Sequence, residues 1–189
     1  GLTKGRYILL SAHREENIDT DRNFLQLFTA VNAMAEKYDM PILYSCHPRS
    51  RKRLEATGFR LDSRVIAHEP LGFHDYNCLQ MNAFAVVSDS GTLPEESSFF
   101  LSVGKPFPAI SIRTSTERPE ALDAGCFILA GIDAESLLQA VKMADGMQRT
   151  ACFGTPVEDY TAENVSMKVA RIIQSYTGIV NKMVWRKDG

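Results

Sequence analysis

Short apolar runs alternate with amphipathic stretches from Tyr7 onward, and this alternation limits the fold more than any other feature of the sequence. It is the pattern of repeated strand–helix units, which build a parallel sheet with helices on its faces. The predicted strands are Tyr7–Ser11, Pro41–Cys46, Arg64–Ala67, Ala83–Ser88, Phe107–Ile112 and Cys126–Ala130. We therefore expect an α/β fold, a doubly wound Rossmann-like parallel sheet of about six strands.

The stretches between the predicted strands have the spacing of helices. Residues Asp21–Tyr38 place apolar side chains at helical intervals, and Thr20 or Asp21 can cap the first turn. Shorter helices are predicted over Ser50–Thr57, Phe73–Met81, Leu93–Leu101, Arg118–Asp123 and Asp133–Asp145.

A long amphipathic helix is predicted near the end of the chain, over residues 161–178, after a loop at residues 151–156. Thr161 is expected to cap this helix, and we expect its apolar stripe to lie across the outside of the domain. The tail at residues 179–189 carries the only tryptophan, Trp185, which is expected to anchor it.

The composition is typical of a soluble globular protein, with 44% hydrophobic and 23% charged residues, and it disfavours a disordered or coiled-coil chain. The 21 basic and 23 acidic residues give a net charge of −2, so no basic field draws nucleic acid or an anionic membrane surface. No apolar run reaches the roughly 20 residues of a membrane span. Four scattered cysteines form no CxxC pair, which disfavours a zinc or redox site and favours a reduced, cytoplasmic location.

The chain of 189 residues fits one domain, which we expect to span residues 1–189. The first predicted strand begins within a few residues of Gly1, as in a protein cut at a domain boundary. We therefore expect this chain to be the carboxyl-terminal part of a longer protein.

In a sheet of this kind ligands bind at the carboxyl ends of the strands, so polar residues that follow apolar runs form the candidate site. His13 and Arg14 follow the first strand, where they could hold a phosphate or transfer a proton, or belong to a solvated loop. His47 and Arg49 follow the second strand, in a cationic cluster that a solvated helix face would also explain.

Small residues follow the fourth predicted strand and lead into a helix. Unpaired backbone N–H groups at that helix start, with Ser90 and Gly91, would form an anion site. Glu96, one turn into the helix, is suited to bridging the two hydroxyls of a ribose. Helix capping by Ser90 and Thr92 is the alternative, but it does not explain the acidic pair Glu95 and Glu96.

Two further segments could complete a nucleotide site. Arg113 and Arg118, with hydroxyls such as that of Thr116, precede another helix start and would line a diphosphate. The turn at Glu69–Phe73 could hold the edge of a nucleobase or be an ordinary turn. No segment is a Walker A or a GxGxxG motif, which disfavours a P-loop protein or a dinucleotide oxidoreductase.

Together these segments resemble the non-hydrolysing UDP-N-acetylglucosamine 2-epimerases of bacteria. The family's Gly-His-Arg-Arg-Glu-Asn is similar to Ala12–Asn17, its Ser-Gly-Gly-x-Gln-Glu-Glu is similar to Ser90–Glu96, and its Thr-Glu-Arg-Pro-Glu stands intact at Thr116–Glu120. The resemblance covers essentially the whole chain. It implies the carboxyl-terminal, UDP-binding half of a two-domain GT-B fold, with the amino-terminal half absent.

The resemblance also implies a reaction. The family removes the C2 proton and expels UDP, and UDP re-adds to the glycal intermediate after reprotonation on the other face, without a metal or a redox cofactor. His13 is implied to be catalytic or to stabilise the leaving group, and Glu96 to bind the ribose. The implied partners are a UDP-sugar substrate, the absent half and a second copy in a homodimer.

The remaining implied roles concern the nucleotide and the sugar. The implied diphosphate ligands are Ser90, Gly91, Thr92, Arg113 and Arg118. The implied uracil neighbourhood is Leu71, Gly72 and Phe73. Candidate sugar or closure contacts are Arg14, His47, Arg49, Thr116 and Glu117.

Three residues depart from the family pattern, because Glu15 replaces its second arginine, Thr92 its second glycine and Pro94 its glutamine. These changes look more like the capsule and O-antigen branch that forms UDP-N-acetyl-L-fucosamine by C2 epimerisation. A GT-B glycosyltransferase and a non-catalytic UDP-sugar sensor are the alternatives from other classes. The residues at Thr116–Glu120, together with His13, disfavour the glycosyltransferase.

Overall fold

A computed structural model describes residues 1–187, and its centre is a six-stranded parallel sheet in the order β3-β2-β1-β4-β5-β6. The strands are β1 Ile8–Ser11, β2 Ile42–Ser45, β3 Val65–His68, β4 Ala85–Ser88, β5 Ala109–Ser111 and β6 Ile128–Leu129. All six predicted strands are present in the predicted chain order. The doubly wound α/β fold is therefore confirmed.

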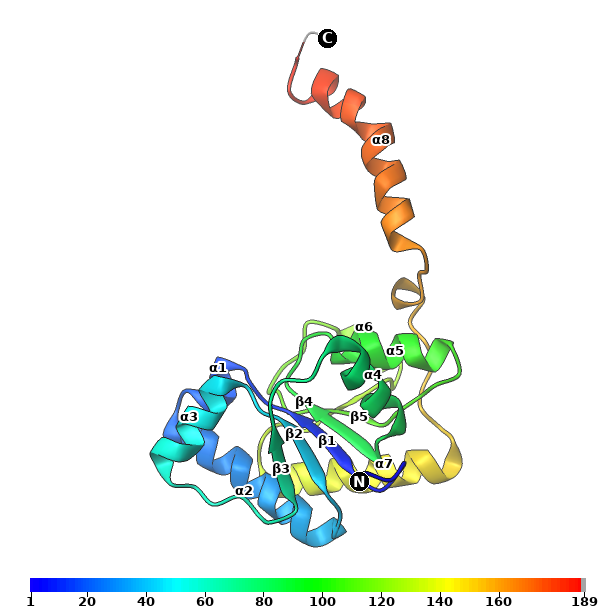
Figure 1. The fold of residues 1–189 in the computed structure, drawn as a ribbon. Helices are drawn as coiled ribbons and strands as arrows, with labels where there is room; N and C mark the ends of the chain where they lie inside the picture. The colour runs from blue at the N-terminus through cyan, green and yellow to red at the C-terminus, as the bar shows by residue number, and fades with distance from the viewer. Residues whose placement is uncertain (188–189) are drawn as a thin grey trace.

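Helices α1 to α6 lie between successive strands, and α7 and α8 follow the last strand (Figure 1). They are α1 Glu15–Ile18, α2 Asp21–Tyr38, α3 Pro48–Thr57, α4 Phe73–Asn82, α5 Leu93–Ser102, α6 Pro119–Asp123, α7 Ala134–Thr150 and α8 Val165–Met183, with a 3-10 turn, η1, at Glu158–Tyr160. The short helix α1 lies where only a loop was expected. Helix α7 continues five residues beyond Asp145, where the sequence pattern had predicted its end.

The strand order reverses at β1, which pairs with β2 on one side and β4 on the other. Ser11, Ser45 and Ser88 lie in register at the carboxyl ends of these three strands. Small hydroxyl side chains therefore line the edge of the sheet at the switch point, where ligands bind in folds of this kind.

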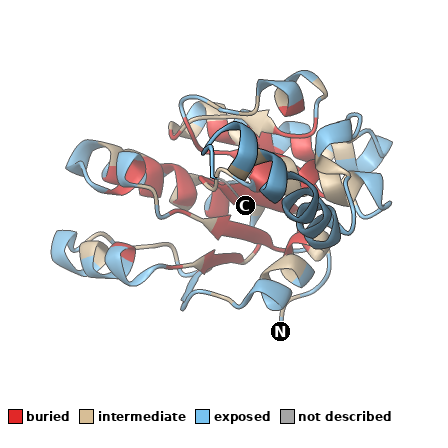
Figure 2. Cartoon of the chain, turned by 90° about the horizontal axis from the view of Figure 1, so that it is seen from above, coloured by how far each residue is buried: buried red, intermediate tan, exposed pale blue. Residues whose placement is uncertain are grey.

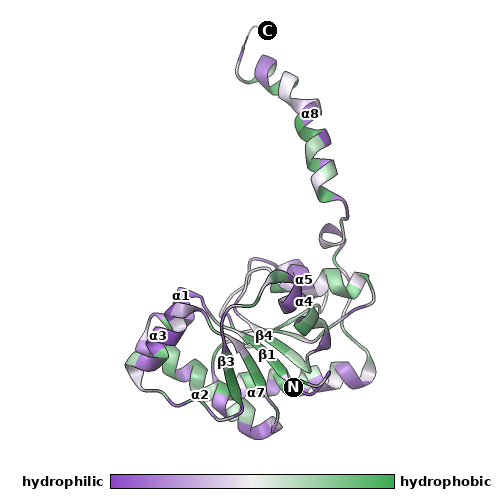
Figure 3. Cartoon of the chain, viewed as in Figure 1, coloured by the Kyte–Doolittle hydropathy of each residue, from purple (hydrophilic) through white to green (hydrophobic). Residues whose placement is uncertain are grey.

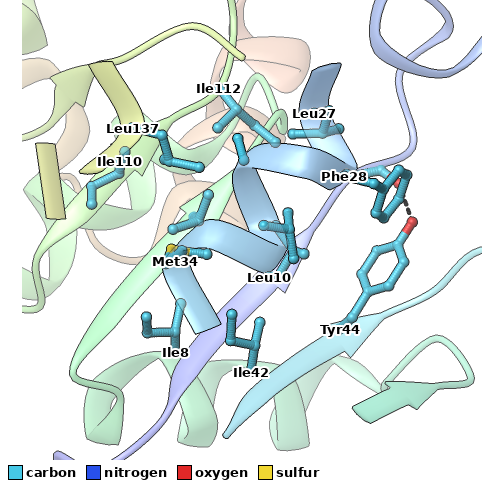
Figure 4. Close-up of a cluster of buried hydrophobic side chains, with 14 of the residues drawn as sticks. Ile8, Leu10, Leu27, Phe28, Met34, Ile42, Tyr44, Ile110, Ile112 and Leu137 are labelled. Carbon is cyan, nitrogen blue, oxygen red and sulfur yellow. Dashed lines mark hydrogen bonds between the residues drawn. The ribbon is translucent and has the colours of Figure 1, made fainter. Parts of the chain in front are cut away.

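Side chains alternate between two cores because successive residues of a strand point to opposite faces. Ile8 and Leu10 pack with α2 and α7 on one face, and Leu9 packs with α5 and α6 on the other. Figure 4 shows part of the first core, including the buried Tyr44, whose hydroxyl donates a 3.0 Å hydrogen bond to the Ala12 carbonyl. Figure 2 shows the buried residues gathered along the strands and the inner sides of the helices.

Helix α8 stands away from the body, contrary to the expectation that it lies across the domain (Figure 1). Six of its apolar residues are each 46–60% exposed, and Figure 3 shows hydrophobic residues along the length of the helix. These residues are Val165, Val169, Ile172, Ile173, Tyr176 and Ile179. None of these residues belongs to either hydrophobic core in the described part of the chain.

The start of α8 also differs from the prediction. The helix begins after Asn164, which has a left-handed backbone with φ of 55° and no side-chain capping bond. The Thr161 hydroxyl instead donates to the Glu158 carbonyl, closing the η1 turn. Trp185 is 65% exposed, so the expectation that it anchors the tail is wrong for the described residues.

Two further observations bear on the class of protein. Among the described residues, no helix is long and apolar enough to cross a membrane. All four cysteines are free, and Cys46 and Cys126 are buried.

Candidate functional site

Two adjoining cavities open at the carboxyl ends of β1 and β2, and the smaller one extends to β4. The smaller cavity, of about 280 Å³, is lined by Ser11, His13, Ser45, His47, Pro70, Tyr76, Ser90 and Glu96. The larger, of about 670 Å³, is lined by His13, Arg14, Glu15, Glu16, His47 and Arg49. The fold thus brings together His13, Ser90 and Glu96, which the sequence pattern selected from separate segments. His13 and His47 line both cavities.

Glu96 presents a fixed carboxylate to the smaller cavity from the first turn of α5. The buried Gln80 amide, on α4, donates to its Oε2 at 2.7 Å, and the Thr92 hydroxyl donates to its Oε1 at 2.6 Å. Each oxygen keeps a lone pair that can accept from a ligand hydroxyl. No sequence pattern indicates a role for Gln80, because an amide in an amphipathic helix is usually exposed.

The loop between β4 and α5 is held by its own hydrogen bonds, and the Arg14 guanidinium, from the loop after β1, lies against it. The Ser90 N–H donates to the Ser88 hydroxyl at 3.0 Å, and the Ser90 and Thr92 hydroxyls are 3.0 Å apart. A Cβ on Gly91 would lie 3.1 Å from Nη2 of Arg14. Arg14 therefore sits against the bare backbone at the start of α5, where the helix already favours an anion.

His13 is held by a carboxylate that was not predicted. Oδ2 of Asp89 accepts from the backbone N–H groups of His13 and Arg14, each at 2.9 Å, and from the Asn17 amide at 3.1 Å. Oδ1 of Asp89 lies 3.2 Å from Nδ1 of His13. The His13 side chain is 48% exposed, whereas that of Asp89 is fully buried. The available signal was an acidic residue directly after a wholly apolar strand.

Tyr76, on α4, also lines the smaller cavity and was not predicted. Burial raises the pKa of its hydroxyl to about 12, and the nearby Glu96 carboxylate acts in the same direction. The phenol is therefore neutral at physiological pH and can donate a hydrogen bond into the cavity.

Arg113 and Arg118 line neither cavity, because carboxylates of this chain hold both. Arg113 is 6% exposed, donates to both oxygens of Glu117 at 2.5 and 2.8 Å, and reaches Glu16 at 3.2 Å. This ion pair lowers the pKa of the Glu117 carboxyl to about 2. Arg118 Nε donates to Glu95 at 2.7 Å. Thr116 and Glu117 lie with them, outside both cavities.

The segment Leu71–Phe73 leads into α4 beside Glu96. Gly72 caps α4, and Phe73 is 78% exposed. Phe73 lines a mostly apolar groove of about 610 Å³ between α4 and α5, and Glu96 borders both this groove and the smaller cavity. A flat aromatic ligand could therefore reach Phe73 while its polar part reaches Glu96.

His47 and Arg49 begin α3. The His47 ring accepts from the Arg49 N–H at 3.3 Å, and the Arg49 guanidinium pairs with Glu15 at 3.2 Å and Asp19 at 2.8 Å. Across residues 1–187, no three His, Cys, Asp or Glu side chains are placed to hold a metal ion together.

Comparison with known proteins identifies the family. The model of the UDP-N-acetylglucosamine 2-epimerase family matches residues 1–174. This chain belongs to that family. It is 37% identical over 141 residues to UDP-N-acetylglucosamine 2-epimerase of Methanococcus maripaludis, covering 72% of this chain and 37% of the relative.

Solved structures agree with this family assignment. The Rickettsia bellii UDP-N-acetylglucosamine 2-epimerase matches 98% of the chain with a TM-score of 0.84 and 38% identity. The Methanocaldococcus jannaschii enzyme, solved in complex with UDP-GlcNAc and UDP, matches 89% with a TM-score of 0.76 and 29% identity. The present chain spans 48% and 45% of those two chains, about half of each.

Proposed function

We propose that the complete protein is a UDP-N-acetylglucosamine 2-epimerase and that this chain is its UDP-binding half. The observation that carries the proposal is the cavity shared by His13, Ser90 and Glu96, at the switch point of the sheet. A relative of the same fold was solved with UDP-GlcNAc and UDP, which supports a nucleotide sugar as the ligand.

The contacts of the cavity support the following proposed roles for its residues. Glu96, held by Gln80 and Thr92, accepts the ribose hydroxyls. Ser90, Gly91, Thr92 and the start of α5 bind the diphosphate, with Arg14 as a further cation because it lies against Gly91. The uracil lies near Leu71, Gly72 and Phe73. Arg113 and Arg118 join the diphosphate only by leaving Glu117 and Glu95.

The reaction is an elimination followed by an addition. A base removes the C2 proton, the bond from C1 to the UDP oxygen breaks, and a glycal and UDP result. A proton then returns to C2 on the opposite face, and the same UDP oxygen re-forms its bond to C1, so no atom is oxidised. His13 lies between the proposed diphosphate and sugar positions, where it can carry a proton or stabilise the departing UDP.

The remaining groups come from outside this chain. The amino-terminal half supplies the catalytic carboxylates and closes over the sugar, with Arg14, His47, Arg49, Thr116 and Glu117 as contacts at closure. The amino-terminal half contacts the exposed apolar face of α8 and covers it. We place the complete protein in the cytoplasm as a homodimer; the free thiols agree with a reduced compartment.

Calorimetric titration of UDP into this chain tests the binding site. Replacing Glu96 with Ala should weaken binding by roughly 1.5–3 kcal/mol, the value for hydrogen bonds to a charged group. Ser90→Ala should weaken it as well. Glu135→Ala is the matched control. Glu135 also lies in the first turn of a helix, α7, but it lines neither cavity. Unchanged affinity in Glu96→Ala and Ser90→Ala would place the nucleotide elsewhere.

An activity assay of the complete protein tests the proposed reaction. Supplied with UDP-N-acetylglucosamine in deuterated water and no sugar acceptor, it should form the C2 epimer and exchange the C2 proton with solvent. A glycosyltransferase or a sensor would leave C2 unlabelled, and that result would overturn the proposal.

A further inference from the structure

Asp89 joins the two loops that form the site. It follows β4 directly and is fully buried, and its Oδ2 accepts three hydrogen bonds from residues of the loop and helix after β1. Two of the donors are backbone N–H groups, at His13 and Arg14. The carboxylate therefore fixes the main chain that carries His13. All three of these hydrogen bonds go to Oδ2, and none goes to Oδ1.

The second oxygen of Asp89 has a different environment. Among residues 1–187, no aligned hydrogen bond reaches its buried Oδ1, and the nitrogen that contacts it is Nδ1 of His13, at 3.2 Å. A buried carboxylate oxygen that accepts no hydrogen bond lowers the stability of the folded state, because its lost hydration is not replaced. A proton on Nδ1 offsets part of that loss, because it places positive charge 3.2 Å from Oδ1, whereas a bare Nδ1 would set its lone pair against a negative oxygen. The Ser11 hydroxyl, 3.5 Å from Nδ1, is the other polar group beside this nitrogen, and it can serve as acceptor as well as donor.

We propose that Asp89 is a positioning residue that keeps the His13 proton on Nδ1 and leaves Nε2 free of a proton. A neutral imidazole has one proton on one of its two nitrogens, and the partner of one nitrogen decides the state of the other. In the described part of the chain, neither a hydrogen bond nor an ion pair engages Nε2. Nε2 is then the acceptor that His13 offers to a ligand.

The catalytic consequence rests on the proposed function. If His13 receives a proton or a hydrogen bond during epimerisation, it does so through Nε2, and the wrong tautomer would present an N–H instead. Asparagine at a comparable position in the serine proteases keeps the geometry but imposes the wrong tautomer, at a cost of about 10⁴ in rate. Asp89→Asn is the corresponding variant here, because its oxygen can still accept from the loop while its amide faces Nδ1.

Nitrogen-15 spectra of the imidazoles test the tautomer in the 189-residue chain, at a pH high enough for the histidines to be neutral. His13→Gln identifies the His13 signals. The wild-type chain should show a protonated Nδ1 and a bare Nε2, and Asp89→Asn should exchange the two. Asn17→Ala is the matched control, because it removes a donor to Oδ2 and leaves the Oδ1 contact, so the wild-type tautomer should persist.

The wild-type spectrum decides the proposal even if Asp89→Asn fails to fold, since a proton on Nε2 would overturn it. In the complete protein, Asp89→Asn should lower kcat at least tenfold with less change in KM. Unchanged kcat would overturn the positioning role. A wild-type protein without epimerase activity would instead refute the proposed function, and the tautomer measurement would still stand.

Discussion

Gly154 shows how closely single residues are constrained in this molecule. Its backbone has a φ of +88°, and a Cβ there would lie 2.5 Å from Ala124 O and from the carbonyl of Gly125. Gly146, in the exposed middle of α7, has open space around it.

We predict opposite effects of alanine at these two glycines. Gly154→Ala should lower the free energy of unfolding by about 1–3 kcal/mol or more, the cost of a strained backbone plus the clash. Gly146→Ala should raise it by roughly 0.5–1 kcal/mol, because alanine favours a helix interior. Urea unfolding followed by circular dichroism measures both. A tolerated Gly154→Ala would contradict the packing of this loop.

The ion pair of Arg113 and Glu117 predicts a pH dependence of stability. Arg113 lowers the pKa of the Glu117 carboxyl to about 2 in the folded state, below its ordinary value of 4.5. A lowered pKa stabilises the fold above the unfolded value, and this contribution is lost as pH falls from about 4.5 to 2. Glu117→Gln should therefore lose less stability over that window than the wild type.

Urea unfolding at several pH values measures the difference. Glu36→Gln provides the control, because it removes the same charge from an exposed position on α2 that forms no ion pair among residues 1–187. Its acid profile should follow that of the wild type. Parallel profiles for Glu117→Gln and the wild type would contradict the ion pair.

Sequence reasoning selected three candidate residues that the structure brings to one cavity, but it missed the residues that hold them in place. His13, Ser90 and Glu96 follow apolar runs, and the carboxyl ends of parallel strands meet at one edge. Asp89 and Gln80 act through contacts across 76 and 16 positions of the chain, which local patterns do not encode. The sequence pattern favours a diphosphate role for Arg113 and Arg118, because it does not show that Glu117 and Glu95 pair with them.

At the scale of elements, hydrophobic pattern predicted the strands well. Each lies within two residues of its predicted bounds. The central strands β1, β2, β4 and β5 are buried on both faces and therefore need a continuous apolar run. Helix α1 was missed, since four residues are too few to show a helical period. The amphipathic stripe of α8 predicted a helix but did not identify the surface that covers it.

Helix α8 predicts a separable contribution to stability. A chain ending at Asn164 should keep the thermal midpoint of the body within a few degrees, because the apolar residues of α8 contact neither core in the described structure. It should also self-associate less, since a large exposed apolar face is lost. Calorimetry and sedimentation velocity measure the two effects. A large fall in the midpoint would show that α8 packs on the body in solution.

At the scale of the whole molecule, binding and turnover should separate. This chain covers about half of its solved relatives, and it holds the proposed nucleotide contacts without the second wall of a closed site. We expect the isolated chain to bind UDP and to show no C2 exchange with UDP-N-acetylglucosamine. Measurable exchange by the chain alone would show that the catalytic groups are all present in it.

The pairing of β1 with β4 has a consequence for the order of events during folding. The hydrogen bonds that the loop after β1 donates to Asp89 span 75 and 76 positions, so the site assembles only after a long-range closure across the sheet. Strands β1 and β2 and the helix between them can come together earlier, without forming a site. The proposed nucleotide site therefore forms only when β4 pairs with β1, and a newly made chain should gain affinity for UDP only after that pairing.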